Sequence, residues 1–365
     1  MGRCPGWHRG ADPRGGQSEN SLITSTRSTK PRIEVWSPWD GRANAKRMQE
    51  FETNEESRLP DDDVHTTSMT VLIASHNRAE ALNQTLLDMS KLHTVGLDVE
   101  WVVVDNNSTD ETPDIVRRHR NQLPVRLLSE PRAGKNIALN HALANVDLGE
   151  IVVLTDDDVS PDRNWLQAIS NGCKQWKDIS VFGGKIIPRW PIDPPPWVRF
   201  SGIADFGYSA HDLGSSGRLY PPEMRPYGPN MWVRREIFEA GHRFPEYVGP
   251  RPKDRIMGSE TVFLISLAEA GFDAAYIPDA VVEHRIEERT LSTEWIVTRA
   301  FGCGRGMVHG HHQNGSLLRE LAQLPWLTAQ GISTIGRLDD PNMVARRVFV
   351  NSRLGVLYER CRQLR

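Results

Sequence analysis

Short apolar runs alternate with amphipathic segments through the middle of this chain, and each run ends at polar residues. The runs occupy residues 70–75, 99–104, 125–128 and 151–155. They are rich in Val, Ile and Leu, which is typical of strands buried on both faces of a sheet. Apolar residues at helical spacing fill residues 79–92 and 136–144. The alternation predicts right-handed βαβ units, that is, an α/β fold with a mostly parallel sheet flanked by helices.

A mostly parallel sheet places the carboxyl ends of its strands at one edge, and ligands of such sheets bind there. The segments that follow the four expected strands are residues 75–78, 105–107, 129–136 and 156–158. We therefore expect polar residues that are far apart in the sequence to meet in one crevice.

Three adjacent carboxylates, Asp156, Asp157 and Asp158, follow the fourth expected strand. Neighbouring carboxylates repel one another, so a fold tolerates them at low cost only where a cation or hydrogen-bond donors compensate. Oxygen ligands suit Mg²⁺ or Mn²⁺, which commonly bridge one or two carboxylates to substrate phosphates. The alternative is an ordinary acidic turn. That is our interpretation of the similar run at residues 61–63, which no apolar strand precedes.

Other polar residues at the same edge have two interpretations each. Asp105 ends the second strand, where a carboxylate can accept hydrogen bonds from a ribose or a base, or can form a local turn with the asparagines that follow. Arg78, Arg132 and Lys135 are placed to meet a diphosphate, although each alone is more typical of a surface charge.

Two further patterns favour a structural role. The glycines of residues 302–306 (GCGRG) do not follow a strand at dinucleotide-binding spacing. His309, His311 and His312, near Cys303, do not match a standard zinc-ligand spacing, so we expect a solvated histidine-rich loop there.

Composition bounds the remaining possibilities. The 365 residues carry a formal net charge of −3, which argues against a general nucleic-acid binder. No run approaches the roughly 18–20 apolar residues that cross a bilayer, and no apolar signal core opens the chain. The four cysteines are scattered. We therefore expect a reduced, cytoplasmic protein.

Composition and hydrophobic periodicity divide the chain into three parts. Residues 1–68 are polar and without sustained periodicity, which predicts a disordered tail. Met69 directly precedes the first strand, so part of this tail is a candidate artefact of start-codon choice. Residues 69–310 are expected to form the catalytic-sized domain, with 200–228 as a mobile loop over the site. Residues 311–365 are expected to form a helical extension.

The last segment, residues 343–365, interleaves apolar residues with arginines. Such a basic amphipathic helix suits peripheral contact with the anionic inner face of a membrane. A helix that packs on its own domain with a solvated basic face is the alternative.

Several ordered segments together resemble family 2 glycosyltransferases of the GT-A fold. They are residues 74–78 (ASHNR), 103–110 (VVDNNSTD), 134–136 (GKN), 154–158 (LTDDD), 258–263 (GSETVF), 270–272 (AGF) and 276–284 (YIPDAVVEH). The resemblance covers about residues 69–306, and the ordered set is more specific than any single motif.

The resemblance implies a nucleotide-sugar donor site, a divalent cation and a general base. Asp156 and Asp158 match the family's D-x-D element, which holds Mn²⁺ or Mg²⁺ on the diphosphate. His284 is a candidate further ligand, with an ordinary core or surface histidine as the alternative. Glu260 matches the general base, although the family usually has an Asp preceded by Glu, and Ser259 precedes it here. The expected nucleotide-sugar contacts are Ala74, His76, Asn77, Arg78, Asp105, Lys135, Asn136 and Asp157.

The resulting hypothesis is a metal-dependent, inverting glycosyltransferase of the hexosyltransferase type. It would move sugar from a nucleotide-sugar to a hydroxyl of a glycan or lipid-linked acceptor in polysaccharide or glycolipid synthesis. One alternative is a catalytically inactive nucleotide-sugar-binding module. This alternative stays open because Ser259 and Glu260 differ from the family's usual Glu-Asp pair. Another is a haloacid-dehalogenase-like phosphatase, because Asp156-x-Asp158-x-Ser160 approximates that family's nucleophile motif.

Overall fold

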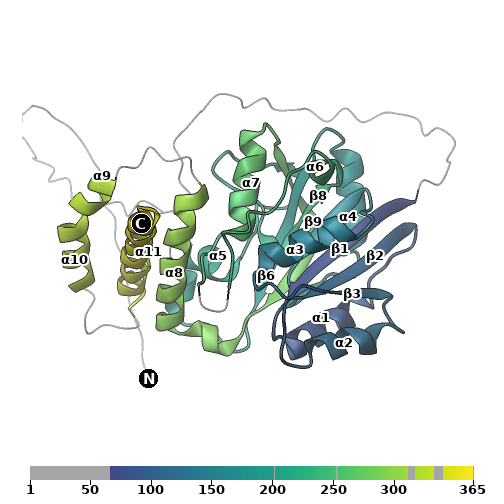
Figure 1. Ribbon diagram of the computed structural model, residues 1–365, viewed down its shortest axis with the longest axis horizontal. Helices are drawn as coiled ribbons and strands as arrows, with labels where there is room; N and C mark the ends of the chain where they lie inside the picture. The colour runs from purple at the N-terminus through teal and green to yellow at the C-terminus, as the bar shows by residue number, and fades with distance from the viewer. Residues whose placement is uncertain (1–65, 201, 252–253, 311–316, 333–339, 365) are drawn as a thin grey trace, which may run out of the picture. The chain divides into compact units, whose positions relative to one another are not determined.

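The computed structural model describes residues 66–200, 202–251, 254–310, 317–332 and 340–364 (Figure 1). The expected tail, apart from its last three residues, lies outside this part of the chain. So do the acidic run at 61–63, His311 and His312. The first strand already begins at Thr67.

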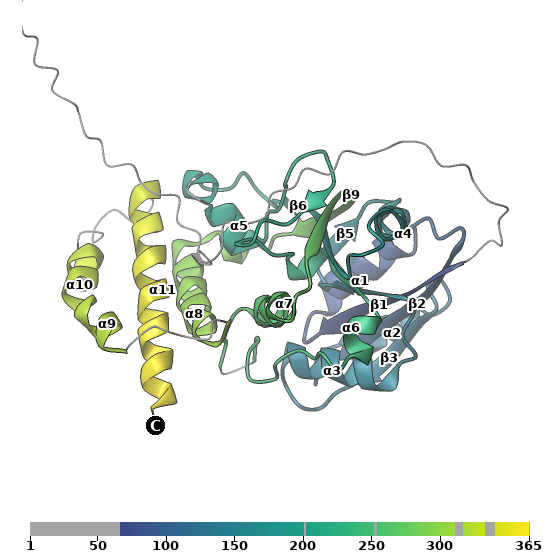
Figure 2. The ribbon, with the colours of Figure 1, turned by 90° about the horizontal axis from the view of Figure 1, so that it is seen from above.

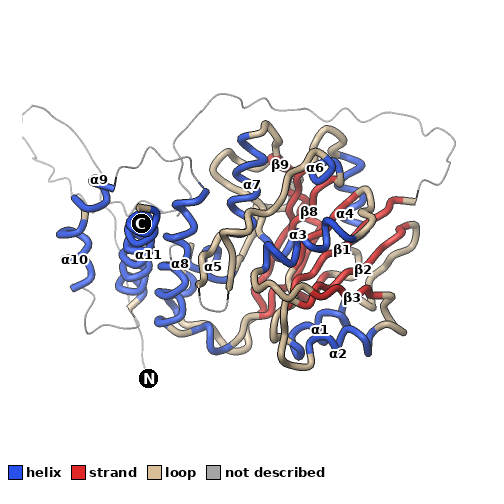
Figure 3. Tube along the Cα trace, viewed as in Figure 1, coloured by secondary structure: helices blue, strands red, loops and turns tan. Residues whose placement is uncertain are grey.

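One mixed sheet forms the centre of the described structure, shown in red in Figure 3. Its strand order is β3-β2-β1-β4-β8-β6-β9-β5, with β7 paired to β9. The strands are β1 (Thr67–Ser75), β2 (Leu97–Asp105), β3 (Val125–Ser129), β4 (Ile151–Thr155), β5 (Val159–Pro161), β6 (Val181–Arg189), β7 (Arg218–Leu219), β8 (Met231–Arg234) and β9 (Ala274–Arg285).

The first four strands have the parallel arrangement that the alternating pattern predicts. β1 pairs in parallel with β2 and β4, and β2 pairs in parallel with β3. The second half departs from it, because β8 joins β4 and β6 antiparallel, while β6 and β9 are parallel. The expected α/β fold is therefore confirmed, with a sheet that is parallel in its first half and mixed beyond β4.

Helices cover both faces of the sheet. The helices of the described residues are α1 (Ala79–Met89), α2 (Thr112–His119), α3 (Lys135–Asn145), α4 (Trp165–Gln175), α5 (Ile203–Tyr208), α6 (Glu236–Glu239), α7 (Ser259–Glu269), α8 (Thr293–Gly310), α9 (Leu317–Ala322), α10 (Leu324–Ile332) and α11 (Pro341–Gln363). The same residues form the short 3₁₀ turns η1 (Pro196–Arg199), η2 (Gly228–Asn230) and η3 (Glu288–Leu291).

The pleat of β1 sends alternate side chains to two cores, as period-2 strand geometry requires. Val71 and Ile73 pack with α1, α2 and α4 on one face, whereas Leu72 packs with α3, α6 and α7 on the other. Burial on both faces explains why the strands read as continuous apolar runs rather than alternating ones.

Two sequence expectations about the loops are wrong in part. Residues 200–228 contain α5 and β7, and Tyr208 in α5 is 1% exposed, so α5 is packed structure, whereas residues 214–219 are exposed. His309 lies in α8, where its Nε2 is 3.2 Å from Oε1 of the buried Glu359. Spacing alone missed both, because an isolated aromatic or histidine gives no periodic signal.

The C-terminal helix α11 packs along α8, and Figure 2 shows the two side by side. Val344 and Val348, which would face a bilayer in the membrane interpretation, are buried in a third core with α5 and α8. Arg353 pairs with Glu320 and Arg362 pairs with Asp254. The structure therefore favours the packed-helix alternative. Among the described residues, helices that combine the length and the hydropathy of a membrane span are absent.

Candidate active site

The carboxyl ends of β1, β2 and β4 meet at one edge of the sheet, as expected. Ser75 at the end of β1 is paired with Asp105 at the end of β2, and Ile73 is paired with Thr155 at the end of β4. The acidic triplet that follows Thr155 is therefore level with the last residues of β1. This register brings the first and fourth strand ends together.

The three aspartates of the triplet have three different environments. Asp157 points toward β1, where its Oδ2 accepts a 2.6 Å hydrogen bond from Ser75 Oγ. Asp158 contacts Arg78 and His284. Asp156 contacts Lys135, with its Oδ1 2.5 Å from Nζ. Burial and the charges of its two neighbours raise the pKa of Asp157, although Arg78 and Ser75 oppose this.

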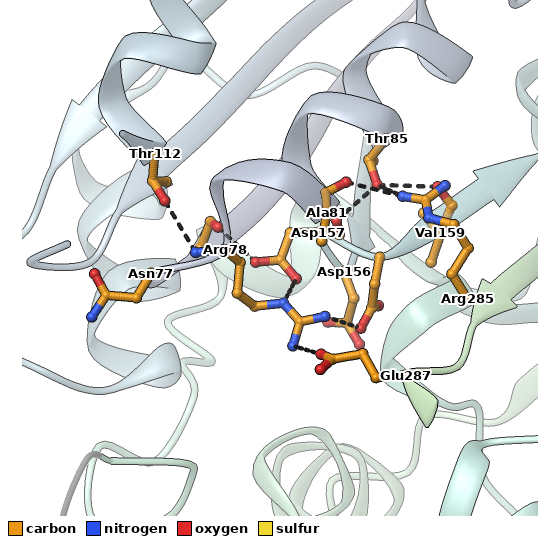
Figure 4. A network of polar contacts seen from close by, with 12 residues as sticks. Asn77, Arg78, Ala81, Thr85, Thr112, Asp156, Asp157, Val159, Arg285 and Glu287 are labelled. Carbon is orange, nitrogen blue, oxygen red and sulfur yellow. Dashed lines mark hydrogen bonds and ion pairs between the residues drawn. The ribbon is translucent and has the colours of Figure 1, made fainter. Parts of the chain in front are cut away.

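Arg78 compensates the charge of the triplet. Its Nε lies 2.9 Å from Asp157 Oδ1, its Nη2 lies 2.6 Å from Asp158 Oδ2, and its Nη1 lies 3.0 Å from Glu287 Oε1. Figure 4 shows the guanidinium of Arg78 between the carboxylates of Asp157 and Glu287. Burial alone would lower the pKa of Arg78, but the three carboxylates raise it. Arg78 therefore holds acidic side chains together in this structure, rather than presenting a free cation.

His284 on β9 faces Asp158 with one defined ring nitrogen. Its Nδ1 lies 2.8 Å from the Tyr208 carbonyl oxygen. A carbonyl only accepts hydrogen bonds, so Nδ1 carries the hydrogen. Its Nε2 lies 3.3 Å from Asp158 Oδ1. Burial opposes protonation of Nε2, but the hydrogen bond and charge of Asp158 raise the pKa of His284.

The Asp158–His284 pair fits a small divalent cation as well as a proton. Adjacent ligands of an octahedral Mg²⁺ or Mn²⁺ ion are about 3 Å apart, given bonds of about 2.1 Å. The 3.3 Å separation of Oδ1 and Nε2 is close to this. The carbonyl bond at Nδ1 fixes the tautomer that leaves Nε2 available as a ligand. The described residues contain no preformed cluster of three such ligands. Substrate phosphates and water usually complete sites of this kind.

Lys135, the first residue of α3, joins Asp156 to Glu260, which lies in the first turn of α7. Its Nζ is 2.5 Å from Asp156 Oδ1 and 2.5 Å from Glu260 Oε1. Burial alone would raise the pKa of Glu260, but the charge and hydrogen bond of Lys135 lower it. Glu260 is therefore an ionised carboxylate, 80% shielded from solvent, beside the triplet.

Gly228 leaves room for the Glu260 carboxylate. A Cβ atom at Gly228 would lie 2.6 Å from Glu260 Oε1, which is too close for non-bonded atoms. We expect Gly228→Ala to displace the flexible carboxylate, at little cost in stability. Because misplacing a reacting group by about 1 Å can cost 10²-fold in rate, we expect turnover to fall by about that factor. Steady-state kinetics beside a thermal melt would check this, and unchanged turnover would contradict it.

Residues that follow β1 and β2 lock the two loops together. His76 Nδ1 lies 2.7 Å from the Asn106 carbonyl oxygen, and Asn77 Oδ1 accepts a 2.7 Å bond from the Thr109 amide. Asp105 Oδ1 accepts a 3.2 Å bond from the Ser108 amide, which is the local-turn interpretation of this residue. Ala74 lies beside them as the penultimate residue of β1.

Three expected residues lie away from this cluster or face elsewhere. Asn136 is 1% exposed, and its Nδ2 donates to the carbonyls of Pro245 and Val248, so it holds the loop before α7. Asp157 is 6% exposed and turned toward the sheet. Arg132 pairs with Glu130 on the rim. Any contact of Asn136 or Asp157 with a bound nucleotide-sugar would therefore be indirect.

Sequence reasoning missed two partners of the cluster. Ser75 holds Asp157, and Glu287 completes the shell around Arg78. The position of Ser75 at the end of an apolar strand was a usable signal. Glu287 gave none, because it is separated from Arg78 by more than two hundred residues.

Comparison with known proteins identifies a shared segment. Residues 70–241 match the sequence profile of the family described as "Glycosyl transferase family 2". The segment contains the triplet, Arg78 and Lys135, whereas Glu260 and His284 lie beyond it.

Individual relatives and a solved structure agree with the profile. The chain is 32% identical over 234 residues to the "Probable glycosyltransferase YdaM" of Bacillus subtilis, covering 62% of this chain and 52% of that protein. It is 23% identical over 163 residues to the "Glucosyl-dolichyl phosphate glucuronosyltransferase" of Haloferax volcanii, covering 44% and 51%. The chain thus spans about half the length of these relatives.

The fold is similar to that of the mannosyltransferase PcManGT from Pyrobaculum calidifontis, solved in complex with GDP-Man and Mn²⁺. The TM-score is 0.53 with 21% identity, and the match covers 81% of this chain and 86% of that one. The expected GT-A fold is thereby confirmed.

Proposed function

Residues 70–241 of this chain belong to glycosyl transferase family 2, and from that premise we propose that the protein is a metal-dependent, inverting glycosyltransferase. It moves a sugar from a nucleotide-sugar donor to a hydroxyl group of an acceptor. The observation that carries the proposal is the convergence of Asp158 with His284, and of Lys135 with Glu260, at one edge of the sheet.

Donor binding is assigned to the ends of β1, β2 and β4. Ligands of open α/β sheets bind at this edge, and the loops after β1 and β2 are locked together there. In this proposal His76, Asn77 and Asp105 lie against the nucleotide.

Asp158 and His284 would hold the divalent cation, with Asp156 adding negative charge nearby. When bound, a divalent ion supplies positive charge against which the leaving diphosphate is stabilised. That the fold neighbour from Pyrobaculum calidifontis was solved with GDP-Man and Mn²⁺ supports this assignment.

Glu260 is the proposed general base. Its lowered pKa keeps it ionised and able to accept the proton of the acceptor hydroxyl. Lys135 is shared between Glu260 and Asp156. If a bound diphosphate attracts Lys135 away from Glu260, the pKa of Glu260 rises and it becomes a stronger base. Direct attack of the hydroxyl on the donor then inverts the anomeric centre.

The acceptor is proposed to be a glycan or a lipid-linked sugar. Two relatives support this class by their names, the dolichyl phosphate enzyme of Haloferax volcanii and the "O-antigen chain rhamnosyltransferase WbaN" of Salmonella anatum. The latter is 26% identical over 194 residues, covering 51% of this chain and 56% of that protein.

A thermal-shift screen tests the donor and metal assignments together. We expect one class among GDP-mannose, UDP-glucose and UDP-N-acetylglucosamine to raise the melting temperature only when Mn²⁺ is present. At a donor concentration of 100 times its Kd, the shift should be roughly 5–10 °C. Excess EDTA should abolish the shift, and added Mn²⁺ should restore it.

Three other outcomes would contradict the proposal. A donor that raises the melting temperature equally with and without Mn²⁺ would show that the cation does not take part in donor binding. Donor binding without release of nucleoside diphosphate, across acceptors, would indicate an inactive binding module. Hydrolysis of p-nitrophenyl phosphate without donor turnover would favour the phosphatase alternative.

A further inference from the structure

The glycine-rich run at residues 302–306 has no role in the donor site, yet its position in the fold is unusual. All three of its glycines lie inside α8, an 18-residue helix. Glycine is disfavoured inside helices because it loses the most backbone freedom on folding. Three glycines in five residues therefore require a packing reason.

One face of α8 lies directly against the backbone of the segment that leads into α7. A Cβ atom at Gly306 would lie 1.8 Å from the Met257 carbonyl oxygen, and one at Gly302 would lie 3.1 Å from the Arg255 carbonyl oxygen. The Met257 amide also donates a 3.1 Å hydrogen bond to the Gly302 carbonyl. Glycine is required at position 306 because backbone occupies the place of a side chain.

The opposite face of α8 packs equally closely on α11. A Cβ atom at Gly304 would lie 1.8 Å from the Ser352 carbonyl oxygen, and one at Gly355 of α11 would lie 2.1 Å from the Phe301 carbonyl oxygen. Both views of the ribbon show α8 between α11 and α7 (Figures 1 and 2). The alternating glycines thus serve two different neighbours.

A charged side chain between these glycines ties the three parts together. The Nε of Arg305 lies 2.7 Å from Glu359 Oε2 on α11, and its Nη1 lies 2.5 Å from Asp254 Oδ1. Asp254 Oδ2 in turn accepts a 2.8 Å bond from Arg362. The Arg305 and Glu359 side chains are only 7% and 4% exposed. Asp254 is therefore anchored through both carboxylate oxygens.

The anchored segment ends at the proposed base. Gly258 follows Met257 with a φ of +102°, and its carbonyl accepts the Val262 amide at 2.9 Å as α7 begins. Glu260 is the second residue of α7. A shift of the Asp254–Met257 backbone is thus transmitted to Glu260 within one helical turn.

We infer that Asp254 and Gly306 are positioning residues, which hold residues 254–258 on α8 and thereby place the Glu260 carboxylate beside Lys135. The inference rests on the proposed role of Glu260 as the base. It also assigns a function to the α8–α11 pair that the segment matched by the family profile does not contain.

Two glycine substitutions of equal steric severity separate positioning from folding. Gly306→Ala pushes against the Met257 carbonyl, whereas Gly304→Ala pushes against the Ser352 carbonyl at the same 1.8 Å. We expect both to lower the melting temperature. At a temperature where both variants are folded, Gly306→Ala should reduce kcat for nucleoside diphosphate release by about 10–100-fold. The KM for the donor found in the thermal-shift screen should stay within about twofold, and Gly304→Ala should keep kcat within about threefold.

Asp254→Asn provides a second, milder variant if Gly306→Ala does not fold. It keeps the shape of the side chain and removes the charge that Arg305 and Arg362 share. We expect about a 10-fold fall in kcat with donor KM unchanged. In a Glu260→Gln background, Asp254→Asn should cause no further loss, because it acts through Glu260.

The inference is overturned if folded Gly306→Ala, or Asp254→Asn where that glycine variant fails to fold, keeps full kcat. It is also overturned if Gly304→Ala loses kcat as strongly as Gly306→Ala, or if Asp254→Asn multiplies the defect of Glu260→Gln. Full activity of Glu260→Gln would instead overturn the proposed role of Glu260, so the two failures are distinguishable.

Discussion

Replacing Glu260 with glutamine is expected to lower the rate of sugar transfer by about 10²–10⁴-fold, the usual contribution of a general base. Glutamine keeps the size of the side chain and can still accept a hydrogen bond from Lys135, but it cannot take the acceptor proton. Lys135 retains Asp156 as a charged partner, so the fold should persist. Steady-state kinetics would show a fall in kcat with little change in donor KM.

The same helix offers a matched control for this substitution. Glu269→Gln changes an exposed carboxylate at the other end of α7 and should leave kcat unchanged. If Glu260→Gln retained near-full activity, another group would have to accept the proton. If it abolished donor binding as well, Glu260 would belong to the donor site instead.

Replacing Asp158 with asparagine is expected to remove the metal-dependent stabilisation by the donor and to lower turnover by about 10²–10³-fold. Loss of one preorganised group that stabilises transition-state charge typically costs this much. Arg78 keeps Asp157 and Glu287 as partners, so the cluster should not collapse. The charge of Asp158 helps to raise the pKa of Asp157, and its removal relieves that repulsion.

Thermal melts with and without Mn²⁺ measure this effect directly. Asp178→Asn, which changes an exposed carboxylate outside the cluster, serves as the control and should retain the full shift. A donor-induced shift that survives in Asp158→Asn and still needs Mn²⁺ would place the cation elsewhere. Because the side chain of His284 faces Asp158 through Nε2, His284→Ala should weaken the same response.

The sequence predicted the strands and helices at the edge of the sheet where the donor is proposed to bind, because apolar runs and helical spacing are local signals. β4 spans Ile151–Thr155 as the apolar run did, and α1 begins at Ala79 as expected. Parallel pairing of the first strands follows from their alternation with helices. The position of the acidic triplet at the strand ends followed from that topology, before any contact was known.

The direction of each aspartate was not predictable in the same way. Three consecutive side chains cannot all face one crevice, and their neighbours decide which of them do. A hydrogen bond from Ser75 turns Asp157 toward the sheet. Asp156 forms an ion pair with Lys135, and Asp158 forms one with Arg78. These partners come from β1, α3 and the loop after β1, so their distances depend on how the layers pack.

The sequence by itself determined the α/β alternation, the edge at which polar residues gather and the family profile that residues 70–241 match. Only the tertiary structure decided that Glu260 meets Lys135, that His284 meets Asp158 and that the glycines of α8 face backbone. The physical reason is the distance along the sequence over which each kind of signal acts. Periodicity and turn chemistry act over a few residues, but Lys135 and Glu260 are brought together across 125 positions by helices and strands whose packing no local pattern encodes.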